Sequence, residues 1–349
     1  MDILELLTIS FKKNASDLHI SPGQPPILRI NGDLLPIKES PIIDPETAKN
    51  FIYSFFDEKQ KQEFEAEWEI DFAIELPHVS RFRVNAFRQE KGIAAVFRVI
   101  PEAVPTLDQL EMPAVFKQLL DLPNGLILVT GPTGSGKSTT LAAMVDYINT
   151  NQRCHIITIE DPIEFSHQSK KSLISQRQIS RDTHNFPAAL RSALREDPDV
   201  ILVGEMRDLD TIRLALTAAE TGHLVMATLH TSSAARAINR IVDVFSAGEK
   251  NIIKNMLSES LQAVICQTLV KKIAGGRVPA FEIMLGTSAI RNLIREDKIA
   301  QMYSSIQTGS AVGMCTLDQY LQTLVAKNII TPVSARENTV NKNTLPIEK

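Results

Sequence analysis

The stretch Gly131-Pro-Thr-Gly-Ser-Gly-Lys-Ser138 decides the fold, because it matches the P-loop pattern at every fixed position. It stands between an apolar run (126–130), which predicts a strand, and a run that predicts a helix. Glycines let backbone N–H groups turn inward around phosphate oxygens, and the helix N-terminus adds its positive end. In such a loop Lys137 reaches the β- and γ-phosphates, and the Ser138 hydroxyl ligates Mg²⁺. A Gly-rich turn that merely precedes a helix is disfavoured, so the sequence predicts a nucleotide-binding domain. The predicted phosphate-binding residues are Gly131, Pro132, Thr133, Gly134, Ser135, Gly136, Lys137, Ser138 and Thr139.

The sequence around this loop predicts a mainly parallel sheet. From position 125 onward, short Val/Ile/Leu runs at 126–130, 156–159, 200–203 and 224–228 alternate with helical stretches. Such runs are typical of strands covered by helices on both faces. We expect the last third, including 249–269, to be mostly helical and the tail after Pro332 to be polar and frayed.

The first hundred residues predict a smaller α+β module. Asn31-Gly32 is a typical hairpin signal, and three strand-like runs follow at 69–76, 81–88 and 93–100. The middle run alternates, so Arg81 and Arg83 share the face opposite the core. The expected division is therefore an N-terminal domain (1–100), a proline-containing linker (101–124), a nucleotide-binding domain (125–331) and a polar tail (332–349).

Composition excludes several classes of protein. The chain has 349 residues with 37 basic and 41 acidic side chains, and its net charge of −4 lacks the basic excess of a general nucleic-acid binder. No run reaches the roughly 18 apolar residues of a membrane helix, and the N-terminus lacks the features of a signal peptide. Cys154, Cys266 and Cys315 are far apart and fit a reducing compartment, with neither a disulfide framework nor a zinc site. We therefore expect a cytoplasmic protein with no direct membrane insertion.

Two apolar runs end in acidic residues. The run 199–205 has the position of a Walker B element and ends in Glu205, a carboxylate suited to orient or deprotonate the attacking water and to lie beside the metal. The run 159–164 brings Glu160, Asp161 and Glu164 past another strand. Ligands bind at the carboxyl ends of parallel strands, so these acids are expected to border Mg²⁺ and the water. A surface acid and a charged loop stopped by a proline are the alternatives.

Histidines and arginines supply less specific signals. His223 and His230 flank one apolar strand, and the sequence leaves open whether they are polar core residues or sensors of the γ-phosphate. Arg81, Arg83 and Arg98 lie outside the nucleotide domain. An arginine supplied across an interface can stabilise the transferring phosphoryl group, but two arginines on a strand face are commonly just solvated.

The motifs together resemble those of the secretion-superfamily ATPases. GPTGSGKSTT, ITIEDPIEF, LREDPDVILVGEMRD and TGHLVMATLHT resemble the family's Walker A, Asp box, Walker B and His box, in that order. The N-terminal NASDLHI and RFRVNAF runs and the late AIRNLIRE run are similar, more narrowly, to those of type IV pilus retraction ATPases. On its own AIRNLIRE is an amphipathic surface helix that core packing explains.

This resemblance implies a fold and a set of roles. The fold is a PAS-like N-terminal α+β domain followed by a RecA-like P-loop ATPase domain, assembled as a homohexamer that binds ATP with Mg²⁺. Glu205, Glu160, Asp161 and Glu164 would serve hydrolysis, and His230, with His223 upstream, would form the His box. Arg81, Arg83 and Arg98 would reach the nucleotide. The AIRNLIRE helix would serve retraction and not hydrolysis.

The resemblance also implies partners and a place in the cell. An inner-membrane pilus platform protein would receive the motion at the cytoplasmic face, and the paralogue PilU is a further candidate partner. Assembly-type relatives carry a tetracysteine zinc element, and the stretch from Cys266 onward has no CxxC. The alternatives are such an assembly ATPase, a RecA-like nucleic-acid motor and a slow regulatory module. The single tryptophan and the acidic charge balance disfavour the nucleic-acid motor.

Overall fold

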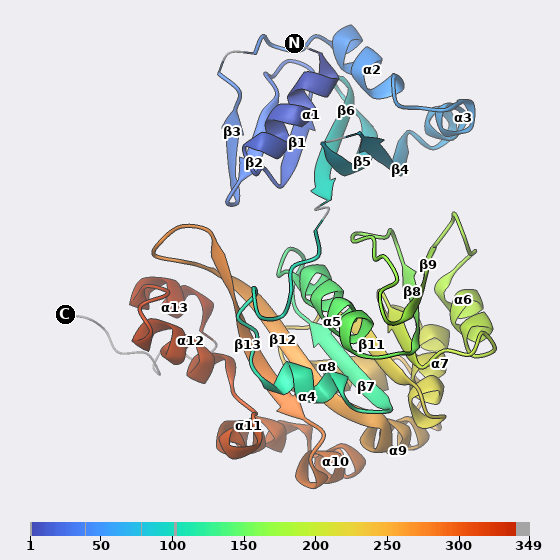
Figure 1. The fold of residues 1–349 in the computed structure, drawn as a ribbon, viewed down its shortest axis with the longest axis vertical. Coiled ribbons are helices and arrows are strands. Elements are labelled where there is room, and N and C mark those ends of the chain that lie inside the picture. Colours follow the sequence, from blue (N-terminus) through green and yellow to red (C-terminus); the bar gives the residue numbers. More distant parts are fainter. Residues whose placement is uncertain (1, 39, 78, 101–102, 340–349) are drawn as a thin grey trace. The chain divides into compact units, whose positions relative to one another are not determined.

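The computed structural model describes residues 2–38, 40–77, 79–100 and 103–339 (Figure 1). The chain divides into two compact units, Met1–Ala103 and Val104–Lys349, which are described separately below. Both units combine helices and sheets, so the predicted α/β class is confirmed.

The first unit is built on a six-stranded antiparallel sheet in the order β3-β2-β1-β6-β5-β4. Its strands are β1 (Asp17–Ile20), β2 (Ile27–Ile30), β3 (Asp33–Pro36), β4 (Glu69–Leu76), β5 (Ser80–Gln89) and β6 (Gly92–Ile100). Its helices are α1 (Ile3–Lys12), α2 (Pro45–Tyr53) and α3 (Glu58–Glu67). Phe82, Val84 and Ala86 of β5 are fully buried, as the alternation predicted, because successive side chains of a strand face opposite sides.

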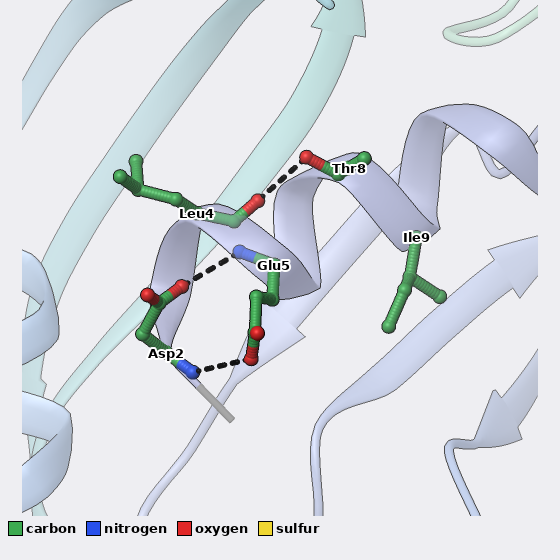
Figure 2. A pocket seen from close by; sticks show the side chains of 5 residues that line it. All are labelled: Asp2, Leu4, Glu5, Thr8 and Ile9. Carbon is green, nitrogen blue, oxygen red and sulfur yellow. Dashed lines mark hydrogen bonds between the residues drawn. The ribbon is translucent and has the colours of Figure 1, made fainter.

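Helix α1 begins with a capping box, which Figure 2 shows. The Asp2 carboxylate accepts from the Glu5 backbone N–H at 2.8 Å, and the Glu5 carboxylate accepts from the Asp2 N–H at 3.1 Å. Two backbone donors at the helix start are thereby satisfied. The exposed side of this turn borders a shallow hollow of about 480 Å³ with Leu4, Thr8 and Ile9.

The second unit is built on a seven-stranded sheet in the order β13-β12-β7-β11-β10-β8-β9. The strands are β7 (Gly125–Thr130), β8 (His155–Glu160), β9 (Leu173–Gln178), β10 (Val200–Val203), β11 (Leu224–Leu229), β12 (Leu261–Lys271) and β13 (Arg277–Leu285). All neighbours are parallel except β12 and β13, so the predicted parallel sheet is confirmed with an antiparallel edge.

Helices cover both faces of this sheet (Figure 1). The α-helices are α4 (Val115–Leu120), α5 (Lys137–Asn151), α6 (Phe186–Ala193), α7 (Leu209–Glu220), α8 (Ala234–Asp243), α9 (Lys250–Ser260), α10 (Ser288–Arg295), α11 (Met302–Thr308), α12 (Leu317–Ala326) and α13 (Pro332–Asn338). Two short 3₁₀ turns are η1 (Ile299–Gln301) and η2 (Ser310–Val312). Helices α4 and α5 pack in one core cluster with alternate strand residues, and α6 to α11 pack in the other.

Three stretches differ from the expectations. Within 249–269, helix α9 ends at Ser260 and β12 starts at once, so the second half is strand and not helix. Within the expected linker 101–124, Phe116 and Leu120 are fully buried in the core of the second unit. Where we expected a polar tail from Pro332, α13 forms, because Thr331 caps it and Pro332 occupies its first turn. The end of the expected tail, 340–349, lies outside the described residues.

Helix α10, which carries the AIRNLIRE run, is fastened to α9. The Arg291 Nε donates to the Gly286 carbonyl at 2.7 Å, and its Nη1 donates to the carbonyl oxygens of Ser258 (2.7 Å) and Glu259. The carbonyls of Ser258 and Glu259 belong to the last turn of α9, so Arg291 satisfies groups that a helix end leaves without partners.

Candidate functional site

The P-loop joins the carboxyl end of β7 to the N-terminus of α5, as predicted. Gly131, Gly134 and Gly136 have φ values of +146°, +77° and +88°, a region that favours glycine. At Gly131 the backbone approach is also close, since a Cβ would lie 2.2 Å from the Gln267 carbonyl oxygen. The loop can therefore take this path only with glycine at that position.

Side chains of the P-loop fit a phosphate ligand. The Lys137 Nζ donates to the carbonyls of Gly131 (2.8 Å) and Pro132 (3.1 Å), which hold it against the loop. Burial lowers the pKa of Lys137, and the charges of Glu205 and Glu164 oppose that shift. The Ser135 Oγ is buried and has no hydrogen-bond partner in the part of the chain that the structure describes. A cation and an unpaired hydroxyl at a helix N-terminus suit anionic oxygens.

Acidic side chains follow the neighbouring parallel strands at the same edge of the sheet. Glu205 follows β10, and its carboxylate lies 2.7 Å from the Arg207 Nη2 and 3.4 Å from the His230 Nε2. Burial by itself would raise the pKa of Glu205, but Arg207 and His230 outweigh burial, so the pKa lies below its usual range. Glu205 is therefore ionised at neutral pH, as a base must be.

Glu160, at the end of β8, has the opposite electrostatic setting. Its Oε1 accepts from the Thr158 hydroxyl at 2.7 Å and from the Gln176 amide at 3.1 Å. Burial is the main cause that raises the pKa of Glu160, and the nearby Glu164 adds to it. Asp161 follows directly and is exposed. The structure thus separates two acids, one ionised and one with an increased affinity for its proton, which is an arrangement suited to acid–base work.

The structure does not bring His223 to this edge. His223 lies at the amino end of β11, where its carbonyl accepts from the Gly125 N–H at 3.0 Å, while His230 follows the carboxyl end. At about 3.3 Å per residue, the strand separates the two histidines by roughly 20 Å. The His223 Nδ1 lies 2.9 Å from the Ala218 carbonyl of α7, so this partly buried imidazole has a local backbone partner.

The predicted arginines belong to the first unit, where they form part of a charged row across the sheet. In this row Arg83 of β5 pairs with Arg98 of β6. Arg98 in turn pairs with Asp17 of β1, and Asp17 pairs with Arg29 of β2. The Arg98 Nε donates to the Asp17 carboxylate at 2.8 Å, and Arg83 pairs with Asp71 at 3.2 Å. Arg81, two residues from Arg83, lies opposite Glu75. Arg98 is half exposed and so accessible to an anion.

Three residues that hold the site were not predicted from the sequence. Gln267 of β12 contacts the P-loop, Gln176 of β9 holds Glu160, and Arg207 pairs with Glu205. A buried amide inside the apolar run around Gln267 was an available signal, because buried polar side chains need partners. Which partners they have depends on strand order, which the sequence does not state.

The described residues were searched for a metal-binding cluster and for a membrane-spanning helix. Within them, no cluster of three or more His, Cys, Asp or Glu side chains is arranged to hold a metal ion. No described helix combines the length and apolar character needed to span a bilayer.

Comparison with known proteins finds close relatives. The sequence profile of the family described as "Type II/IV secretion system protein" matches residues 2–288. A Pseudomonas aeruginosa protein named "Type IV pilus retractation ATPase PilT" is 62% identical over 337 residues, 97% of this chain and 98% of that protein. A twitching motility protein of Neisseria gonorrhoeae is 56% identical over 321 residues, 92% of this chain and 86% of that protein. The crystal structure of the pilus retraction motor PilT with bound ADP matches with a TM-score of 0.89 and 46% identity over 99% of each chain.

Proposed function

The chain belongs to the type II/IV secretion system protein family, and from this premise we propose that it is an ATPase that drives type IV pilus retraction and twitching motility. The near full-length identity to a pilus retraction ATPase carries this proposal. The fold is that of this family, a PAS-like domain followed by a RecA-like P-loop domain, and the likeness to an ADP-bound motor supports nucleotide binding.

The second unit supplies the groups that hydrolysis requires. We assign the phosphates to residues 131–139, with Lys137 as the cation, and a Mg²⁺ ion to Ser138 and Glu205. Mg²⁺ would neutralise charge on the phosphate oxygens. Glu205 takes the proton of the attacking water, because Arg207 and His230 keep its carboxylate ionised. Asp161, Glu160 and Glu164 orient the water, and His230 reports on the γ-phosphate. His223 is not assigned to the site, given its place at the far end of β11.

The remaining parts of the proposal concern assembly. The chain would act as a homohexamer in which Arg81, Arg83 and Arg98 contact the nucleotide phosphates. The exposure of Arg98 supports this role. The ring would work at the cytoplasmic face of the inner membrane on the pilus platform protein, with PilU as a second motor. Three cysteines at separate places in the sequence argue against an assembly-type zinc element.

Paired measurements of ATP turnover and surface motility test the function. Glu205→Gln keeps the shape of the side chain but removes the base, so turnover should fall by about 10²-fold or more and twitching should stop. Glu220→Gln, an exposed acid at the end of α7, is the matched control and should leave both unchanged. Turnover that requires single-stranded DNA, or wild-type protein without turnover, would contradict the proposal.

A further inference from the structure

We propose that Gln267 is a positioning residue of the nucleotide site, which fixes the Ser135–Gly136 peptide so that its N–H faces the phosphates. This inference rests on the proposed function, because it concerns the same loop. Gln267 lies in β12, the strand beside β7, and its side chain is buried.

Both ends of the Gln267 amide are used. The Nε2 donates to the Ser135 carbonyl at 2.7 Å, and the Oε1 accepts from the Thr140 hydroxyl at 2.7 Å. A carbonyl oxygen only accepts, so the NH₂ group must face Ser135, and the Thr140 hydroxyl must then be the donor. The amide therefore has one orientation, and it connects the P-loop to the first turns of α5.

This contact determines where the next N–H points. The peptide group is planar and trans, so the Ser135 carbonyl and the Gly136 N–H point in opposite directions. With the carbonyl drawn toward β12, the Gly136 N–H points away from β12. Backbone N–H groups of this loop type bind phosphate oxygens, and they do so only if their peptide planes have the right rotation.

Gln267 also explains why two positions of the loop are glycine. A Cβ on Gly131 would lie 2.2 Å from the Gln267 carbonyl oxygen, and a Cβ on Gly136 would lie 2.9 Å from its Nε2. Glycine leaves the backbone around these positions with much conformational freedom. A hydrogen bond from a rigid strand removes that freedom before the nucleotide binds, which favours affinity.

The competing interpretation is that Gln267 only ties β12 to α5 through Thr140. Gln267→Glu separates the two interpretations. It keeps the size of the side chain and an oxygen that can accept from Thr140, but it cannot donate to the Ser135 carbonyl as a carboxylate. Gln262→Glu is the matched control, because Gln262 lies in the same strand and donates to the Asn124 carbonyl at 3.1 Å, at the other end of β12.

The experiment uses the full chain and measures ATP turnover, ADP affinity by titration, and the melting temperature without nucleotide. For Gln267→Glu we expect the KM for ATP and the Kd for ADP to rise about tenfold or more, the effect of one lost buried hydrogen bond, with kcat within about threefold of wild type. Gln262→Glu should match wild type. A lower melting temperature with unchanged ADP affinity would overturn the proposal, as would unchanged values throughout.

A second pair of variants covers the case in which Gln267→Glu does not fold. Thr140→Val removes the other attachment of the amide without adding charge, and Thr140→Ser keeps it. We expect a rise in ADP Kd for the valine variant and restoration by serine, and equal Kd values for the two would overturn the proposal. If the wild type binds ADP without ATP turnover, the proposed function fails, while the ADP titrations still decide the role of Gln267.

Discussion

The Glu205 carboxylate lies 3.4 Å from the His230 Nε2, although the two residues follow different strands, β10 and β11. The parallel register pairs Val203 with Ala227, so both strands end at one edge of the sheet. Arg207 approaches the other carboxylate oxygen at 2.7 Å. Two basic side chains therefore hold one acid beside the P-loop.

Removal of Arg207 should change the pH dependence of ATP hydrolysis. Arg207 is the largest influence that lowers the pKa of Glu205 against the effect of burial. In Arg207→Ala the pKa of Glu205 should rise, so the acid limb of the kcat/KM profile should move to higher pH. Arg240→Ala, an exposed arginine of α8, should leave the profile in place. An acid limb that does not move would show that Glu205 is not the titrating base.

Glu160→Gln should alter how stability depends on pH. The folded-state pKa of Glu160 is raised by burial. Below the unfolded pKa the side chain is protonated in both states, so the raised pKa does not reduce the free energy of unfolding there. The cost develops as pH increases from the unfolded pKa of about 4.3 toward the folded value, because the unfolded state releases its proton first. The glutamine variant should therefore gain melting temperature relative to wild type at pH 8 and gain least near pH 4. If the melting temperatures of the variant and the wild type differed by the same amount from pH 4 to pH 8, the raised pKa of Glu160 would be contradicted.

Gly131→Ala should disrupt the nucleotide site by steric conflict. Its Cβ would meet the Gln267 carbonyl, and its φ of +146° disfavours any side chain. We expect a loss of at least about 2 kcal/mol in the free energy of unfolding of the second unit, together with lost ADP binding. Gly248→Ala, where nothing lies within 4 Å, serves as the control. Wild-type ADP affinity in Gly131→Ala would mean that the loop can take another path.

Arg83→Ala tests the proposed role of the first unit. If this arginine stabilises the transferring phosphoryl group, turnover should fall by about 10³-fold or more while ATP affinity changes little. Loss of its pair with Asp71 should have little effect on stability, because the pair is partly exposed. Arg88→Ala, on the same strand beside Trp68, is the matched control. Equal losses in affinity and turnover would count against the role in the transition state.

Two variants of α10 should separate packing from motility. Leu293 is partly buried against the core, so Leu293→Ala should cost about 1–2 kcal/mol of stability. Arg295 is exposed, and Arg295→Ala should keep stability and ATP turnover while twitching is reduced. The melting temperature, turnover and motility of each variant decide the matter. Normal twitching in Arg295→Ala would remove this residue from the proposed retraction surface.

The parts of the fold that the sequence predicted are those with strong local signals. The buried parallel strands β7, β8, β10 and β11 are continuous apolar runs, and β5 alternates. Strand β12 was interpreted as helix, because α9 leads into it at Leu261 without a loop or a glycine to mark the change. Strand β9 went unnoticed since it is polar and lies at the sheet edge.

The candidate site divides in a similar way. The acids after β8 and β10 could be placed near the P-loop, because the ends of parallel strands meet at one edge. Gln267 and Gln176 could not, since their contacts require β12 beside β7 and β9 beside β8. His223 shares a sequence motif with His230, but it lies at the amino end of β11, away from the edge where the acids meet.

The Arg291 hydrogen bonds connect the AIRNLIRE segment rigidly to the helix before it. Its guanidinium joins the last turn of α9 to the bend before α10, so a load applied to α10 passes directly into α9 and the start of β12. Loss of twitching caused by a change at Arg291 would therefore indicate that the connection between α9 and α10 is broken. Loss of twitching caused by a change at Arg295 would instead indicate a lost contact with the partner that the motor moves.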